Sequence, residues 1–75
     1  MSVIPLNSLV IGNTAIIKGF TDNANLQSRM VEMGVLPGVK VRMIKKTPFH
    51  GPLEIKIRSY HLSLRWDDAG QILVN

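Results

Sequence analysis

Hydrophobic and polar residues alternate one by one through the second half of the chain, and this pattern limits what the chain can fold into. In residues 39–43 the apolar side chains are separated by Lys40 and Arg42. Residues 53–57 and 60–64 repeat the same alternation. A period of two places successive side chains on opposite faces of a strand. The pattern therefore predicts three β-strands, each with one face toward a core.

A short helix is predicted before these strands. Residues that commonly cap a helix N-terminus precede it: Asp22, Asn23 and Asn25. Leu26, Met30 and Met33 then recur at the spacing of one helix face. Gly34 follows at the position where a left-handed residue ends many helices, and Pro37 prevents the helix from continuing.

Two further features predict a bent sheet. Residues 14–21 read as a strand, with Gly19 at a bulge or bend. In the segment after the helix, the alternation slips at Met43 and Ile44, which predicts a second bulge. Bulges of this kind allow a sheet to curve around its own core.

The predicted elements form one small domain. Residues 6–11 are expected to pack as a short N-terminal segment with a single helical turn, residues 66–70 as another helical turn, and residues 72–74 as a last strand. About five short strands with one helix between the first two are typical of a partly open, SH3-like β-barrel. Because no repeat or low-complexity linker interrupts the sequence, residues 1–75 are expected to be a single domain.

Composition restricts the chemistry. The chain has no cysteine, which excludes a disulfide and a zinc site with thiolate ligands. Its formal net charge of +4 mildly favours acidic partners, although the longest basic run is only Lys45-Lys46. No signal peptide pattern is found, and no apolar run approaches the roughly 20 residues of a membrane span. The cytoplasm is the expected compartment.

Catalytic groups do not occur in an arrangement that supports a reaction. The serines lie outside the strained Gly-x-Ser-x-Gly motif. Asp67 and Asp68 are adjacent, so they project differently, and Asp67 is interpreted as the cap of a helical turn. Gly34 and Gly38 are not followed by the Lys-Ser or Lys-Thr of a phosphate-binding loop. The sequence predicts a binding protein rather than an enzyme, with no cofactor.

Two histidines are candidate metal ligands, because neutral imidazole suits zinc and iron. His50 lies in a turn-rich loop at residues 47–52, and His61 lies on the outward face of a predicted strand. No local spacing joins them to other ligands. The prediction is that no metal site is present.

Apolar residues in two loops are candidates for contact with a partner. Gly34 and Gly38 are expected to serve the geometry of a turn, and they bracket Val35 and Leu36. These two side chains either close one end of the barrel or are exposed as contacts. Phe49 lies at the tip of a proline-flanked loop and is hard to bury in so small a barrel. Exposed aromatic residues can anchor a protein partner.

Three segments, in this order and spacing, resemble the FeoA family. Residues 29–38 are similar to its Arg-Leu-x-x-Leu/Met-Gly-x-x-Pro-Gly segment. Residues 45–55 are similar to its basic-x-Pro-Phe/Leu-Gly-x-Pro hairpin, and residues 62–69 to its Leu-x-Leu-Arg-x-x-x-Ala ending. Together the resemblance covers about residues 14–75. One departure is His50, at a position where many members have glycine.

The resemblance implies an SH3-like barrel that assists FeoB, the membrane transporter for ferrous iron with a cytosolic G-protein domain. We therefore expect a cytoplasmic accessory protein that regulates ferrous iron uptake and binds the cytosolic part of FeoB. Recruitment to the inner face of the membrane would come through this partner. The candidate contact residues are Arg29, Val35, Leu36, Lys45, Lys46, Phe49, His50 and Arg58.

Other functions remain open from the sequence. Four basic residues project from strands that are expected to be neighbours: Lys40, Arg42, Lys56 and Arg58. They make a nucleic-acid-binding module the main alternative. An iron-responsive regulatory domain is another, since a related domain ends some iron-dependent repressors, and it would require metal binding by His50 and His61. Weak self-association is also left open.

Overall fold

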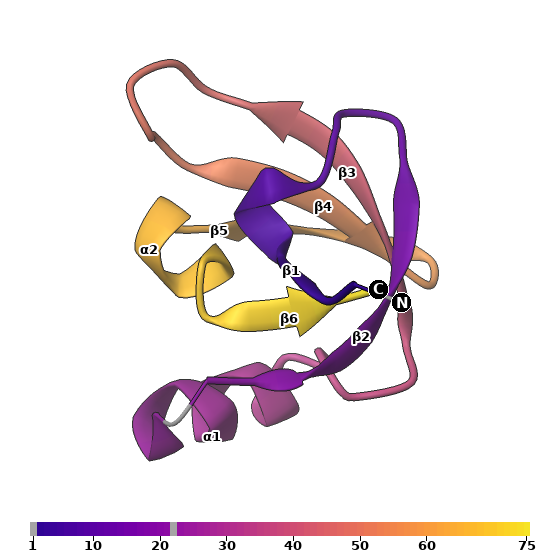
Figure 1. Cartoon of the computed structure of the whole chain (residues 1–75), viewed down its shortest axis with the longest axis vertical. Coiled ribbons are helices and arrows are strands. Elements are labelled where there is room, and N and C mark those ends of the chain that lie inside the picture. Colours follow the sequence, from indigo (N-terminus) through magenta and orange to yellow (C-terminus); the bar gives the residue numbers. More distant parts are fainter. Residues whose placement is uncertain (1, 22) are drawn as a thin grey trace.

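Six antiparallel strands form one curved sheet in the computed structural model, which describes residues 2–21 and 23–75 (Figure 1). The strands are β1 (Ile4–Pro5), β2 (Thr14–Phe20), β3 (Lys40–Lys46), β4 (Leu53–Ile57), β5 (Tyr60–Leu64) and β6 (Ile72–Val74). The helical segments are η1 (Leu6–Ser8), α1 (Ala24–Glu32) and α2 (Trp66–Ala69). The predicted mainly β fold with a short helix after the first long strand is confirmed. The two-residue strand β1 was not predicted.

The strand order is β1-β6-β2-β3-β4-β5, so the last strand of the chain lies between the first two. Ile4 pairs with Val74, so β1 lies at one edge of the sheet with the last strand beside it. Within the described residues no pairing joins β1 to β5, and the sheet is open rather than a closed barrel.

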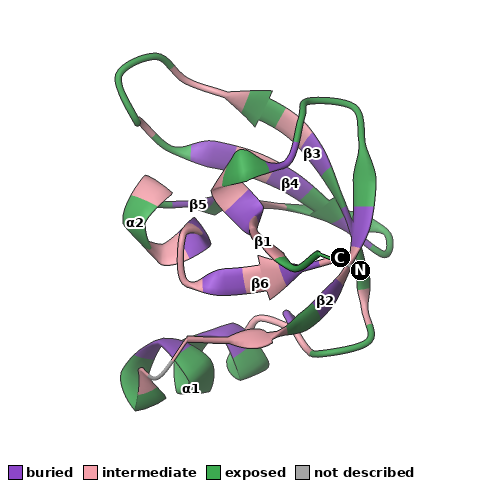
Figure 2. Ribbon diagram, in the orientation of Figure 1, coloured by how far each residue is buried: buried purple, intermediate pink, exposed green. Residues whose placement is uncertain are grey.

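Both predicted bulges are present. The register between β2 and β6 shifts between Ile17 and Gly19. The register between β3 and β4 shifts between Met43 and Lys45. Because a bulge adds one residue to one strand of a pair, it increases the local bend and twist. These two shifts help the sheet to wrap around its core (Figure 2).

The core is made of aliphatic side chains from the inner faces of the strands and from α1, as the alternation predicts. The most deeply buried large residues are Leu6, Ile17, Leu26, Met30, Val35, Val41, Met43, Leu53, Ile55, Ile57, Ile72 and Val74. In the N-terminal segment only Leu6 and Leu9 are buried. Val10 and Ile11 were also expected to pack, and this was wrong, because both are exposed in the turn that leads into β2.

Helix α1 begins at the predicted cap. The side-chain oxygen of Asn23 accepts a hydrogen bond from the backbone N–H of Leu26 at 3.1 Å. The other proposed cap, Asp22, lies outside the described residues. For α2 the cap prediction was wrong, because Arg65 is the N-cap residue and Asp67 lies inside the first turn. A carboxylate in that position still favours the helix through the helix dipole.

The end of α1 explains the turn that follows it. Gly34 has a φ of +84°, in the left-handed region that glycine tolerates best. Its N–H donates to the carbonyl of Val31 at 3.1 Å, and the N–H of Val35 donates to the carbonyl of Met30 at 2.8 Å. This pair of bonds is a Schellman motif, in which the residue after the glycine turns back onto the helix. Val35 is accordingly directed into the core.

Candidate functional site

The loop between β3 and β4 presents a large hydrophobic side chain to solvent. Phe49 is 100% exposed at its tip. The base of the loop is closed by Thr47, whose N–H and hydroxyl both donate to the carbonyl of Pro52, at 3.3 and 2.8 Å. Gly51 donates to the carbonyl of Pro48 at 3.2 Å. Because hydrogen bonds close the loop both at its base and nearer its tip, Phe49 is presented on an ordered backbone.

The tip itself has an unusual backbone. Phe49 and His50 have φ values of +59° and +58°. Residues other than glycine and asparagine seldom adopt this region, because the Cβ approaches the following carbonyl. Local conformational cost of this kind is maintained only where the surroundings impose it. At the tip of this loop, the constraint is the contact of the His50 ring with Trp66.

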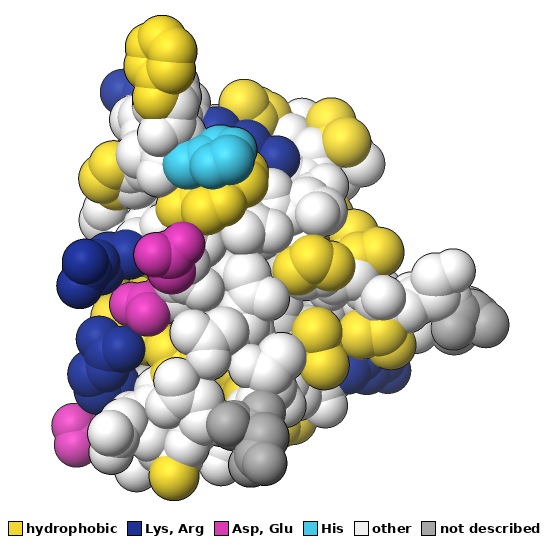
Figure 3. All heavy atoms as spheres, turned by 60° about the vertical axis from the view of Figure 1, so that its left-hand side comes forward, with side chains coloured by type: hydrophobic (Ala, Val, Ile, Leu, Met, Phe, Trp, Pro, Cys, Tyr) yellow, Lys and Arg dark blue, Asp and Glu magenta, His cyan; other side chains and the backbone are white. Residues whose placement is uncertain are grey.

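His50 is stacked on Trp66. The two rings are parallel to within 3°, with centroids 4.2 Å apart. Trp66 is the first residue of α2, so the stack fixes the tip of the β3–β4 loop to a separate element. Figure 3 shows this face, where a histidine covers hydrophobic atoms beside acidic and basic side chains. A shallow hollow of about 210 Å³ lies here, lined by His50, Gly51, Pro52, Arg65, Trp66 and Asp67.

Replacing His50 with alanine is expected to release the loop tip without unfolding the domain. A stacked pair of this type contributes about 0.5–1.5 kcal/mol. Because Trp66 is the only tryptophan in the chain, its fluorescence reports directly on the stack. We expect the emission of the His50→Ala protein to shift to longer wavelength as the indole gains solvent.

The control is His61→Ala, since His61 is exposed on β5 and has no stacking partner among the described residues. It should leave the emission spectrum unchanged. An identical spectrum for His50→Ala and the wild type would contradict the proposed role of the stack.

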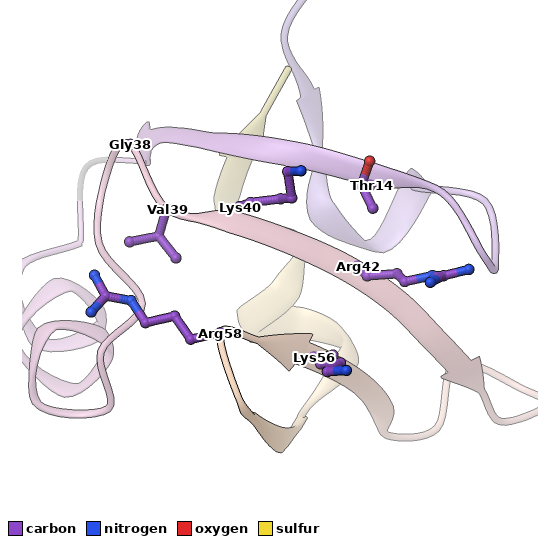
Figure 4. A pocket seen from close by; sticks show the side chains of 7 residues that line it. All are labelled: Thr14, Gly38, Val39, Lys40, Arg42, Lys56 and Arg58. Carbon is purple, nitrogen blue, oxygen red and sulfur yellow. The ribbon is translucent and has the colours of Figure 1, made fainter.

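A second hollow is strongly basic. It has a volume of about 530 Å³ and is lined by Thr14, Gly38, Val39, Lys40, Arg42, Lys56 and Arg58 (Figure 4). Arg42 and Lys56 face each other directly across the β3–β4 ladder. The prediction that the basic residues project from neighbouring strands is confirmed for Lys40, Arg42 and Lys56. For Arg58 it was wrong, because this residue lies in the turn that follows β4. We refer to this hollow as the basic groove.

The remaining candidate contact residues are distributed over the molecule. Val35 is fully buried, so it closes the core rather than meeting a partner. Leu36 is half-buried in the loop that leads into β3. Lys45 is exposed near the β3–β4 loop, whereas the ammonium of Lys46 donates to the carbonyl of Asn7 at 3.0 Å and anchors the N-terminal segment.

Arg29 also has a partner within the fold. Its guanidinium lies 3.4 Å from the carboxylate of Asp68, which links α1 to α2. Such a partly exposed ion pair contributes about 0–1 kcal/mol. Of the predicted contact residues, Phe49 and His50 therefore lie in the β3–β4 loop with Lys45 close to it in β3, whereas Arg58 lies at the basic groove.

Sequence reasoning missed Trp66 and Tyr60. Trp66 supports the loop through its stack with His50. The hydroxyl of Tyr60 donates to the carbonyl of Met33, and the same hydroxyl lies against Gly34. Tyr60 lies in an alternating strand segment, and this local pattern does not indicate a contact with residues as distant in the sequence as Met33 and Gly34.

No three histidine, aspartate or glutamate side chains gather into a metal-binding group within residues 2–21 and 23–75. His50 and His61 belong to different elements, a loop and β5. None of the helices in the described part of the chain is both long and apolar enough to cross a membrane.

A family model described as the FeoA domain matches residues 4–75, which is almost the whole chain. The chain belongs to the FeoA family. This family is associated with ferrous iron transport, and the resemblance found in the three sequence segments is confirmed.

Known proteins agree with this assignment. A Fe(2+) transport protein A/Fe(2+) transporter FeoB fusion protein of Porphyromonas gingivalis is 30% identical over 69 residues, which are 92% of this chain and 8% of that protein. The FeoA-like protein of Clostridium acetobutylicum is 28% identical with a TM-score of 0.89, covering 100% of this chain and 87% of that one.

FeoA of Stenotrophomonas maltophilia, a prokaryotic SH3 domain protein solved in complex with zinc, is 26% identical with a TM-score of 0.80. The alignment covers 93% of this chain and 87% of that one. The expectation of an SH3-like fold is therefore confirmed for this FeoA domain.

Proposed function

We propose that this FeoA domain is a cytoplasmic adaptor of ferrous iron uptake, which binds the cytosolic part of FeoB and regulates transport without catalysing a reaction itself. The observation that carries the proposal is the Porphyromonas gingivalis relative, in which FeoA and FeoB are joined in one polypeptide. A covalent fusion keeps two parts at a high effective concentration, which is useful when they act on each other.

The β3–β4 loop is the surface that suits this role best. Exposed aromatic anchors on well-ordered supports contribute a large share of binding energy in protein interfaces. Phe49 is fully exposed, and its neighbour His50 is fixed on Trp66. Because the loop is already ordered, a partner does not have to supply the entropy of ordering it.

Replacing Phe49 with alanine is expected to weaken binding to the cytosolic part of FeoB by about tenfold or more, the loss typical of an anchor residue. Isothermal titration with the purified cytosolic part, with and without guanine nucleotide, measures this directly. The free energy of unfolding should stay unchanged, because Phe49 makes no core contact.

The matched control is Val31→Ala, which removes an exposed apolar side chain, 52% accessible, from α1 instead. Its affinity should equal that of the wild type. Absence of binding by the wild-type protein in both nucleotide states, together with unchanged iron uptake after deletion of the gene, would disprove the proposed function.

A further inference from the structure

We infer that the basic groove binds an acidic peptide segment in extended conformation, supplied by the protein partner. The inference deepens the proposed function and rests on it for the identity of that partner. It concerns a surface separate from the β3–β4 loop, since the groove lies where β3 begins and β4 ends.

Charge is the first argument. The groove is lined by two lysines and two arginines and by no acidic residue. Within residues 2–21 and 23–75 an ion pair forms between Arg29 and Asp68, which lie outside the groove. The four cations of the groove take no part in it. Arg42 faces Lys56 across the ladder, and like charges directly opposite each other destabilise a sheet. A bound anion would relieve this repulsion.

Spacing is the second argument. Lys40 and Arg42 are two residues apart on one strand and lie on the same face, so their Cα atoms are about 7 Å apart. Successive same-side residues of any extended peptide have this same repeat of about 7 Å. Acidic side chains at alternate positions of a partner segment would therefore meet successive cations. The half-buried Val39 adds apolar contact for the segment between the charges.

Arg58 provides an independent observation. It lies in the two-residue turn between β4 and β5 with a φ of +55°, where glycine or asparagine is the usual residue. Its guanidinium makes no hydrogen bond or ion pair with the described residues, and it extends toward Val39 at the groove (Figure 4). Strained backbone of this kind clusters at sites that contact ligands, and Arg58 has no hydrogen bond or ion pair with the described residues that would account for it.

Arg42 is held ready for a ligand. Its Nε–H donates to the carbonyl of Gly12 at 3.2 Å, which holds the side chain against the turn before β2. A guanidinium carries five N–H donors in a planar fork, so the terminal nitrogens remain available for a carboxylate. The geometry is preorganised for an anion, which lowers the entropy cost of binding.

The test uses the complete chain and a fluorescein-labelled synthetic peptide of about ten residues in which glutamate alternates with serine, matching the strand repeat. Fluorescence anisotropy measures binding, and a peptide with glutamine in place of glutamate is the control ligand. We expect the acidic peptide to bind and the glutamine peptide not to bind. Raising the salt from about 0.02 M to about 0.3 M should weaken binding severalfold, because exposed charges are screened.

Two groove variants and one control variant locate the site. Lys40→Gln/Lys56→Gln should weaken peptide binding about tenfold. Arg58→Gly should weaken it severalfold while thermal stability stays equal or rises, since glycine suits the positive φ. Lys18→Gln, which removes an exposed lysine outside the groove, should bind like the wild type. The stability of Arg58→Gly separates a binding role from a structural one.

Three outcomes overturn the inference. The first is no binding of the acidic peptide at low salt. The second is equal binding by the wild type and the groove variants. The third is tighter binding of a single-stranded RNA or DNA oligonucleotide of matched charge, which would make the groove a nucleic-acid site.

Parallel titrations with the cytosolic part of FeoB distinguish the groove from the proposed function. If the wild type and the groove variants bind that part equally, the groove inference fails and the adaptor function stands. If the wild type does not bind the cytosolic part of FeoB, but the acidic peptide binds through the groove, the adaptor function fails. The groove would then still be a binding site for acidic peptides.

Discussion

Replacing Gly34 with alanine is expected to lower the free energy of unfolding by about 2–4 kcal/mol, through two separate costs. The first is its φ of +84°, which places an added Cβ near the following carbonyl. The second is steric, because that Cβ would collide with the hydroxyl of Tyr60. Tyr60 cannot easily move away, since its hydroxyl donates to the carbonyl of Met33. Urea denaturation followed by circular dichroism measures the loss.

Gly38→Ala is the matched control. Gly38 has a similar φ of +91°, but nothing lies within 4 Å of an added Cβ. It should lose only the conformational part, about 1–2 kcal/mol. In a double-mutant cycle, Tyr60→Phe should recover part of the loss caused by Gly34→Ala, because it removes the colliding hydroxyl. Equal losses at Gly34 and Gly38 would show that the contact with Tyr60 is unimportant.

The long strands could be predicted because their signal is local. The alternating segments at residues 53–57 and 60–64 coincide with β4 and β5. Strand β1 could not be predicted, since it has two residues, Ile4–Pro5, and exists only through its pairing with β6. Whether the sheet closes also depends on the distance between strands far apart in the sequence, which no local period encodes.

The same distinction applies to the candidate sites. The basic groove could be foreseen, because Lys40 and Arg42 occupy the polar positions of one alternating strand and Lys56 those of the next. The stack of His50 on Trp66 could not, because a loop and a helix meet there only through the tertiary fold. The pattern of basic residues along a strand predicts which side chains share one face of the sheet. A contact between two separate elements can be predicted only when the arrangement of all the elements is known.

Introducing aspartate at Val35 is expected to leave the domain largely unfolded, with a loss above about 4 kcal/mol. The sequence left open whether this side chain closes the core or contacts a partner. In the structure it is 0% exposed, and its N–H completes the Schellman motif with Met30. A carboxylate in this position would be buried without a partner, and a domain of this size has little stability to spare. Circular dichroism and the amide dispersion of an NMR spectrum would report the unfolding.

Leu36→Asp is the control for this change, since Leu36 is the next residue but is only half-buried. Its aspartate can reach water, so we expect a loss of about 1 kcal/mol and a folded spectrum. A folded Val35→Asp protein that has lost its affinity for FeoB would reverse the assignment and return Val35 to the contact surface. If Val35→Asp unfolds the domain and Leu36→Asp does not, Val35 is the residue of this turn that the core requires. Leu36 then remains as the apolar residue of the turn that lies near the surface.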